Sequence, residues 1–141
     1  MKRALATAFE AESHEDAEEL AVHWHGAGEL AQAGHYARLA AGRAERALAF
    51  ERSARLYQMA LDCLPAAADR SHLLERLGDA LANAGMGHAA SRSYLDAALG
   101  AEELRRFNLE CRATDQLLRT GHVDEAEPLI RRVLDYVGLY M

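Results

Sequence analysis

The chain has 141 residues, the length of one domain, which leaves no room for a catalytic domain together with a separate regulatory one. Its formal net charge of -6 disfavours polyanions, and its Arg residues are interspersed with Glu and Asp, so we expect no nucleic-acid partner. Ala, Leu, Glu and Arg dominate, whereas Pro occurs only twice and 6% of residues are aromatic, which predicts helices and not strands.

The N-terminus begins basic and turns apolar, but acidic residues in the segment 10–16 interrupt it before a signal-peptide core could form. We therefore expect a helix there. No stretch approaches the roughly 20 apolar residues that span a bilayer, so no membrane partner is expected. Cys63 and Cys111 lie inside long helical patterns without a close partner, which predicts reduced packing thiols in a cytoplasmic protein.

Hydrophobic periodicity and glycine or proline breaks divide the chain into eight expected helices. They cover about residues 2–11, 14–27, 30–47, 49–64, 71–84, 88–99, 101–120 and 123–137. Ser13 is expected to cap the second helix, Asp69 or Ser71 the fifth, and Pro65 ends the fourth. Because every connection is only a few residues long, consecutive helices are expected to pack antiparallel.

A repeat becomes visible when Gly85 is aligned on Gly121, an offset of 36 residues. The same offset pairs Leu81 with Leu117, Ala90 with Ala126, and Tyr94 with Ile130. Gly28 and Ala33 repeat the step from a glycine to a small residue five positions later. We expect the small residue to lie where two helices of a hairpin cross closely, with the large residue beside it.

This pattern resembles the tetratricopeptide repeat. The residues that carry the resemblance are Leu74, Leu77, Gly78, Leu81, Ala90, Tyr94 and Ala97, with part of another copy at Ser53, Tyr57, Ala60 and Pro65. It fits residues 71–137 well, 43–65 partly and 15–41 loosely, with Trp24 at a position for a large residue. Pro128 departs from it and is expected to shift or kink the start of the last helix. The resemblance implies one all-α domain over residues 1–141, an α-solenoid of about four antiparallel hairpins.

Residues 20–29 and 47–57 are also similar to the helical-repeat region that follows the ATPase module in large bacterial signalling proteins, often headed by a serine/threonine kinase domain. That resemblance implies that the chain is a segment of a larger architecture. The sequence carries neither kinase loops nor a phosphate-binding loop, so only a scaffold role is implied.

No pattern of residues indicates catalysis, a cofactor or a metal. His23 and His25 are two residues apart, about 200° around a helix, so their imidazoles point to opposite sides. Trp24 between them is expected to be a large core residue. Cys111 lies beside Arg residues on a helix, and we interpret it as a half-buried packing thiol, although a reactive thiol is the alternative.

The resemblance places the first helix of each hairpin along a concave groove that binds a protein or peptide. The expected groove residues are His72, Glu75, Asp79 and Asn83 on one helix, and Asn108, Arg112, Asp115 and Arg119 on another. Their mixed charges suit a peptide or helix carrying both signs. At any single position, a merely hydrated polar side chain is the competing interpretation.

Two other functions stay open. The apolar C-terminal residues Val133, Leu134, Val137, Leu139, Tyr140 and Met141 favour a helical domain that self-associates as a homodimer, unless they fold back on their own hairpin. The third reading, a helical protein that holds a cofactor or metal, rests only on His23, Trp24, His25 and Cys111.

Overall fold

The computed structural model describes residues 17–65 and 67–139, whose regular secondary structure is all helical, with no strand among them. The expected all-α class is therefore confirmed for this part of the chain. The helix expected over residues 2–11 and the cap at Ser13 lie outside the described residues. The chain divides into two compact units, with the boundary between Ala67 and Ala68. The described segments contain no helix long and apolar enough to cross a membrane.

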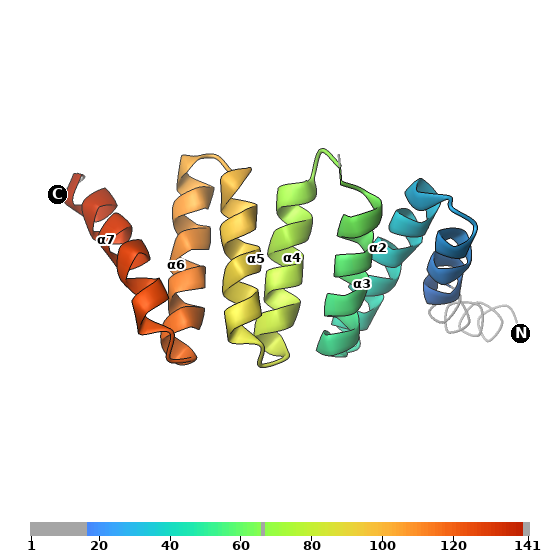
Figure 1. Cartoon of the computed structure of the whole chain (residues 1–141), viewed down its shortest axis with the longest axis horizontal. Coiled ribbons are helices and arrows are strands. Elements are labelled where there is room, and N and C mark those ends of the chain that lie inside the picture. The colour runs from blue at the N-terminus through green and yellow to red at the C-terminus, as the bar shows by residue number, and fades with distance from the viewer. Residues whose placement is uncertain (1–16, 66, 140–141) are drawn as a thin grey trace, which may run out of the picture. The chain divides into compact units, whose positions relative to one another are not determined.

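The first unit contains a helix over residues 17–26, then α2 (Leu30–Arg46) and α3 (Phe50–Cys63), which pack on one another (Figure 1). Its helices meet through alanines, because a methyl side chain lets two backbones approach closely. The central cluster is Ala21, Ala37 and Ala60, flanked by Tyr36 and Met59. Trp24, expected in the core, is only half-buried, although its indole N–H is covered and has no hydrogen-bond partner.

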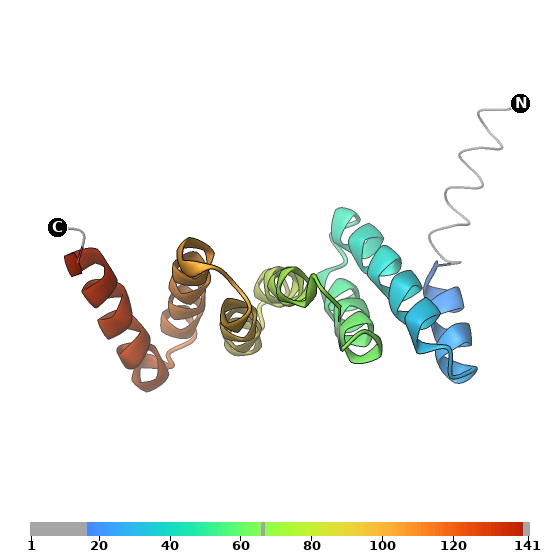
Figure 2. The same ribbon diagram turned by 90° about the horizontal axis from the view of Figure 1, so that it is seen from above.

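The second unit contains α4 (Arg70–Asn83), α5 (Gly87–Leu99), α6 (Glu103–Arg119) and α7 (Val123–Leu139). Each packs on the next, and α5 lies between α4 and α6 (Figures 1 and 2). Its main core combines small and large residues: Ala90, Tyr94, Ala97, Ala98, Ala101, Leu109 and Ala113. The expected helix ends agree with these bounds to within about two residues. The start of α7 is not displaced, because the helix begins at Val123 and continues through Pro128.

Four turns share one backbone motif. At Gly28, Leu48, Gly85 and Gly121 the φ angle is positive, at 78°, 60°, 80° and 80°. At each, two N–H groups close back onto the last helical turn; in the Gly85 turn, Met86 N–H donates to the Leu81 carbonyl at 2.8 Å. The sequence predicts the three glycine turns and a break at residue 48, but not the left-handed conformation of Leu48, since leucine rarely adopts it.

In the hairpin of α4 and α5, the two helices approach closely at Gly78. A Cβ atom on Gly78 would lie only 2.6 Å from Cε1 of Tyr94, so glycine is required there. Ser93 Oγ donates to the carbonyl of Leu74 across the same two helices. Gly78 thus lets the Tyr94 ring lie directly on α4, and this contact sets the position of the tyrosine hydroxyl.

Candidate functional site

The side chain of Arg112 on α6 joins two carboxylates of α4. Its Nη1 donates to Glu75 Oε1 at 2.9 Å, and its Nη2 donates to Asp79 Oδ1. Glu75 and Asp79 face the same partner because they lie four residues apart, one turn along the helix. The guanidinium carbon of Arg112 is 4.5 Å from the centre of the Tyr94 ring, close enough for a cation–π interaction.

Tyr94 completes this cluster. Its hydroxyl donates to Asp79 Oδ1 at 2.7 Å, and its side chain is buried. Burial and the hydrogen bond to the Asp79 carboxylate raise the pKa of Tyr94 well above its usual range, against the smaller opposing effect of Arg112. The tyrosine therefore stays a neutral hydrogen-bond donor across the physiological pH range. We call Glu75, Asp79, Tyr94 and Arg112 the arginine cluster.

A second arginine extends the connection between α4 and α6. Arg105 Nη1 donates to Ser71 Oγ at 2.7 Å, and Nη2 lies 3.5 Å from Glu75 Oε2. Ser71 Oγ in turn donates to the carbonyl of Ala97 on α5 at 2.6 Å. The Glu102 carboxylate caps α6 by accepting from the backbone N–H of Arg105 at 3.0 Å.

Beside the arginine cluster, the surface of α6 forms an open hollow of about 340 Å³. Its lining residues are Tyr94, Asn108, Cys111, Arg112, Asp115 and Gln116. Two side-chain amides, one carboxylate and one guanidinium offer both donors and acceptors to a bound chain. The hollow is therefore suited to hydrogen bonding with main-chain N–H and C=O groups of a peptide.

The eight expected groove residues have different outcomes. The structure brings Glu75, Asp79 and Arg112 into direct contact, and it places Asn108 and Asp115 at the hollow. His72 is exposed, with its Nδ1 3.9 Å from Glu75 Oε2. Asn83 is the last residue of α4, and Arg119, the last of α6, pairs with Asp115 on its own helix at 2.9 Å.

Sequence reasoning did not assign Gln116, Arg105 or Ser71 to this region. The contact between Arg105 and Ser71 joins residues 34 positions apart, so no local sequence pattern could predict it. Gln116 lies eight residues after Asn108, which places it roughly along the same side of a helix. That spacing is the one signal that could have added it to the expected groove.

Cys111 lies half-buried at the edge of the hollow. Burial, followed by the nearby Glu110 carboxylate, raises the pKa of its thiol. Cys63 is buried in the first unit, and the pKa of its thiol is raised by burial and by Asp62. Because a thiolate is the reactive form, both environments favour inert packing thiols over nucleophiles.

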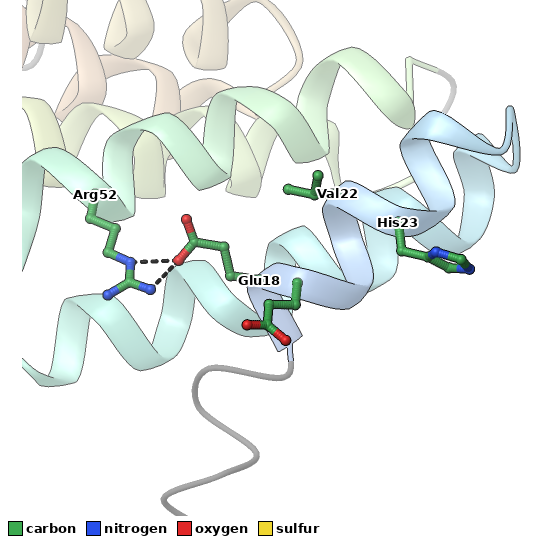
Figure 3. A pocket seen from close by; sticks show the side chains of 5 residues that line it. Glu18, Val22, His23 and Arg52 are labelled. Atoms are coloured by element: carbon green, nitrogen blue, oxygen red, sulfur yellow. Dashed lines mark hydrogen bonds and ion pairs between the residues drawn. The ribbon is translucent and has the colours of Figure 1, made fainter.

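The first unit has a hollow of its own, of about 680 Å³, between the helix over residues 17–26 and α3. Glu18, Glu19, Val22, His23 and Arg52 line it (Figure 3). Arg52 Nε donates to Glu18 Oε2 at 2.6 Å, so the one cation of the lining is neutralised by a carboxylate beside it. Arg52 and Glu18 of this hollow are therefore engaged with each other.

The histidines near this hollow do not gather around a common point. His23 packs edge-on against the Trp24 ring, with ring centres 5.5 Å apart. Within residues 17–65 and 67–139, no group of three or more His, Cys, Asp and Glu side chains is arranged to hold a metal ion. The geometry around His23 and His25 therefore gives no support to a metal-binding reading.

No family model, curated protein or solved structure matches this chain. The described fold and site define an all-helical protein with a polar hollow beside a braced ion-pair cluster.

Proposed function

We propose that this chain is a non-catalytic protein-interaction module, built as a tetratricopeptide-like α-solenoid, that holds a peptide segment of its partner in the hollow on α6. The helical hairpins, the 36-residue offset and the close crossing at Gly78 support this reading. We further propose a scaffold or regulatory role in bacterial cytoplasmic signalling, on the sequence resemblance of residues 20–29 and 47–57 alone.

The observation that carries the peptide-binding proposal is the position of the hollow beside the arginine cluster. Arg112 is fixed by Glu75, Asp79 and the Tyr94 ring, so little side-chain entropy is lost when a ligand contacts it. Asn108 and Asp115 on α6 are exposed and reach the same hollow. The hollow therefore offers a peptide one pre-ordered side chain together with exposed groups that can donate and accept hydrogen bonds.

The charges that line the hollow on α6 determine which ligands can bind there. Arg112 is already neutralised by two carboxylates, so it does not present a free cation to an acidic ligand. Asp115 is 56% exposed at its side chain and makes its ion pair with an even more exposed arginine. We therefore expect a peptide that offers main-chain groups and a basic side chain toward Asp115.

The test is to select binders from a displayed random-peptide library on the wild-type protein, and then measure the dissociation constant of the best peptide for two variants. Asp115→Arg reverses the charge at the hollow and should weaken binding about tenfold or more. Asp62→Arg is the matched control. It too replaces an exposed aspartate that accepts a side-chain hydrogen bond from a residue four positions away, but it lies outside the hollow.

Both variants should keep the helical circular dichroism of the wild type, because each change lies on a solvent-exposed helix surface. Equal affinity of the peptide for the two variants would contradict the proposed site. Failure to select any peptide above background would contradict the proposed function.

A further inference from the structure

The second unit has another hollow, of about 420 Å³, between α5 and α7. Its side-chain lining comes from three consecutive helices, of which α6 is the middle one (Figure 1). The residues that form it are Leu95, Asp96 and Leu99 of α5, Arg106 and Glu110 of α6, and Arg132 of α7. Arg106 and Asp115 are nine residues apart on α6, about 180° around the helix. This hollow, called the α5–α7 hollow below, is therefore separate from the one that Asp115 lines.

The apolar part of the α5–α7 hollow is uncovered. Leu99 is 83% exposed, more than any other large hydrophobic side chain of the described residues. Leu95 lies one turn earlier on the same face of α5, is half-buried, and packs on the cluster of Leu117, Ala126 and Leu129. Leu95 thus forms a fixed floor, while Leu99 offers apolar surface whose removal from water would favour binding.

Two charged side chains of this hollow are not used by the fold. Arg106 donates to the carbonyl of Ala101 at 3.1 Å, and it forms no ion pair within the described part of the chain. Asp96 is exposed, and its carboxylate has no hydrogen bond or ion pair with any residue of that part. By contrast, the Glu110 side chain is 12% exposed and is paired with Arg132 at 2.9 Å. One positive and one negative charge therefore remain uncompensated beside the apolar surface.

These two charges determine which ligands fit. An acidic ligand that reaches Arg106 meets like charge at Asp96, and a basic ligand that reaches Asp96 meets like charge at Arg106. A peptide segment with one acidic and one basic side chain can pair with both residues at once. An apolar side chain between these two groups would cover Leu99.

We propose that the α5–α7 hollow binds a peptide segment of a partner protein that carries an apolar side chain between an acidic and a basic one. The acidic group pairs with Arg106, the basic group pairs with Asp96, and the apolar side chain packs on Leu99. Because both charged residues are exposed, each ion pair contributes little, and the apolar contact supplies most of the affinity. This site is additional to the peptide site proposed on α6 and does not depend on it.

The experiment selects peptides from a displayed random library on the full wild-type chain, with an excess of the soluble Leu99→Glu variant as competitor. The competitor removes peptides that bind any other surface, including the hollow on α6. For the best remaining peptide, Leu99→Glu should raise the dissociation constant about tenfold or more. Leu104→Glu is the matched control, because this leucine is 66% exposed but lies about 200° around α6 from Arg106. It should leave the affinity unchanged.

Charge reversal tests the two polar contacts. Arg106→Glu and Asp96→Lys should each weaken the selected peptide about two- to fivefold. A peptide whose acidic residue is replaced by a basic one should recover its affinity for Arg106→Glu, because the pair is rebuilt with the signs exchanged. Arg55→Glu, which reverses an exposed arginine of α3, is the control and should have no effect.

Three results would overturn the proposal. The first is that no peptide binds above background once the Leu99→Glu competitor is present. The second is that Leu99→Glu and Leu104→Glu have equal effects, or that the two charge reversals leave the affinity unchanged. The third is a wild-type chain that dimerises in sedimentation equilibrium and loses the dimer in Leu99→Glu, because a second copy then occupies the hollow.

Discussion

The hairpins α2–α3 and α4–α5 use the same tyrosine contact in two units of the chain. Tyr57 donates to Glu45 at 3.1 Å in the first, and Tyr94 donates to Asp79 at 2.7 Å in the second. Both tyrosines are buried on the second helix of their hairpin and reach a carboxylate near the end of the first. The same hydrogen bond, from a buried tyrosine to a carboxylate on the preceding helix, therefore occurs in both hairpins.

The two hairpins differ in how tightly the helices cross beneath the tyrosine. At Gly78, an added Cβ would meet Tyr94 ring carbons at 2.6 and 2.7 Å, whereas at Gly42 it would meet only the Tyr57 hydroxyl, at 4.0 Å. The two helical glycines therefore differ in their structural role. Gly78 leaves space for the packed Tyr94 ring, whereas Gly42 has no such neighbour and only lowers the stability of its helix.

The largest expected change in the free energy of unfolding comes from a substitution at the tight crossing of α4 and α5. Gly78→Ala should lower the free energy of unfolding by about 1–3 kcal/mol, because the methyl group overpacks against the Tyr94 ring. Gly42→Ala is the control and should raise it by about 0.5–1 kcal/mol, since alanine favours the helix and the site has room. Urea unfolding measures both. Effects of the same sign would show that the two crossings do not differ as described.

A smaller effect is expected at the hydrogen bond of the tight hairpin. Tyr94→Phe should lower the free energy of unfolding by about 1 kcal/mol at neutral pH, because the donor to Asp79 is lost. The raised pKa of Tyr94 means that the unfolded chain releases this proton first, starting near the usual value of 10.0. The advantage of the wild type is thus present below about pH 10 and declines as the pH rises further.

Urea unfolding of both proteins at neutral pH and near pH 11 checks this dependence. A stability difference that stays constant over this range would contradict the assignment of the buried hydroxyl to Asp79.

The smallest expected change in the free energy of unfolding is at the turns of Leu48 and Gly85. Leu48 holds φ at 60° where the equivalent turn has Gly85 at 80°, and the leucine side chain is 72% exposed. Leu48→Gly should therefore raise the free energy of unfolding by up to about 1 kcal/mol through relief of backbone strain. Gly85→Ala, with nothing within 4 Å of the added Cβ, should lower it by a similar amount. Thermal unfolding would measure both; destabilisation by Leu48→Gly would contradict the strain.

The helices were predictable because their signals are local. Apolar periodicity and the breaks at Gly28, Gly85 and Gly121 place the ends of α2 to α7 to within about two residues. The break at Leu48 was predicted, but its left-handed conformation was not, because leucine does not favour a positive φ angle. Leu48 and Ser53 repeat the five-residue step from Gly85 to Ala90, as Gly28 and Ala33 do.

The candidate site was only partly predictable for a related reason. Helical spacing placed Glu75, Asp79 and Arg112 on helix faces, but it left open whether they bind each other or a ligand. That choice depends on side-chain reach across helices more than 30 residues apart in sequence, as the contact of Arg112 with Asp79 shows. In the structure these three charged side chains contact one another, and the hollow beside them is the candidate binding site.

The most direct test of the account follows the side-chain amide signals of the isotopically labelled protein by nuclear magnetic resonance during titration with a selected peptide. The account predicts that the amide signals of Asn108 and Gln116, which line the hollow, shift progressively to saturation, while that of Gln58 in the first unit stays in place. Saturable binding that leaves the Asn108 and Gln116 signals unmoved would contradict it.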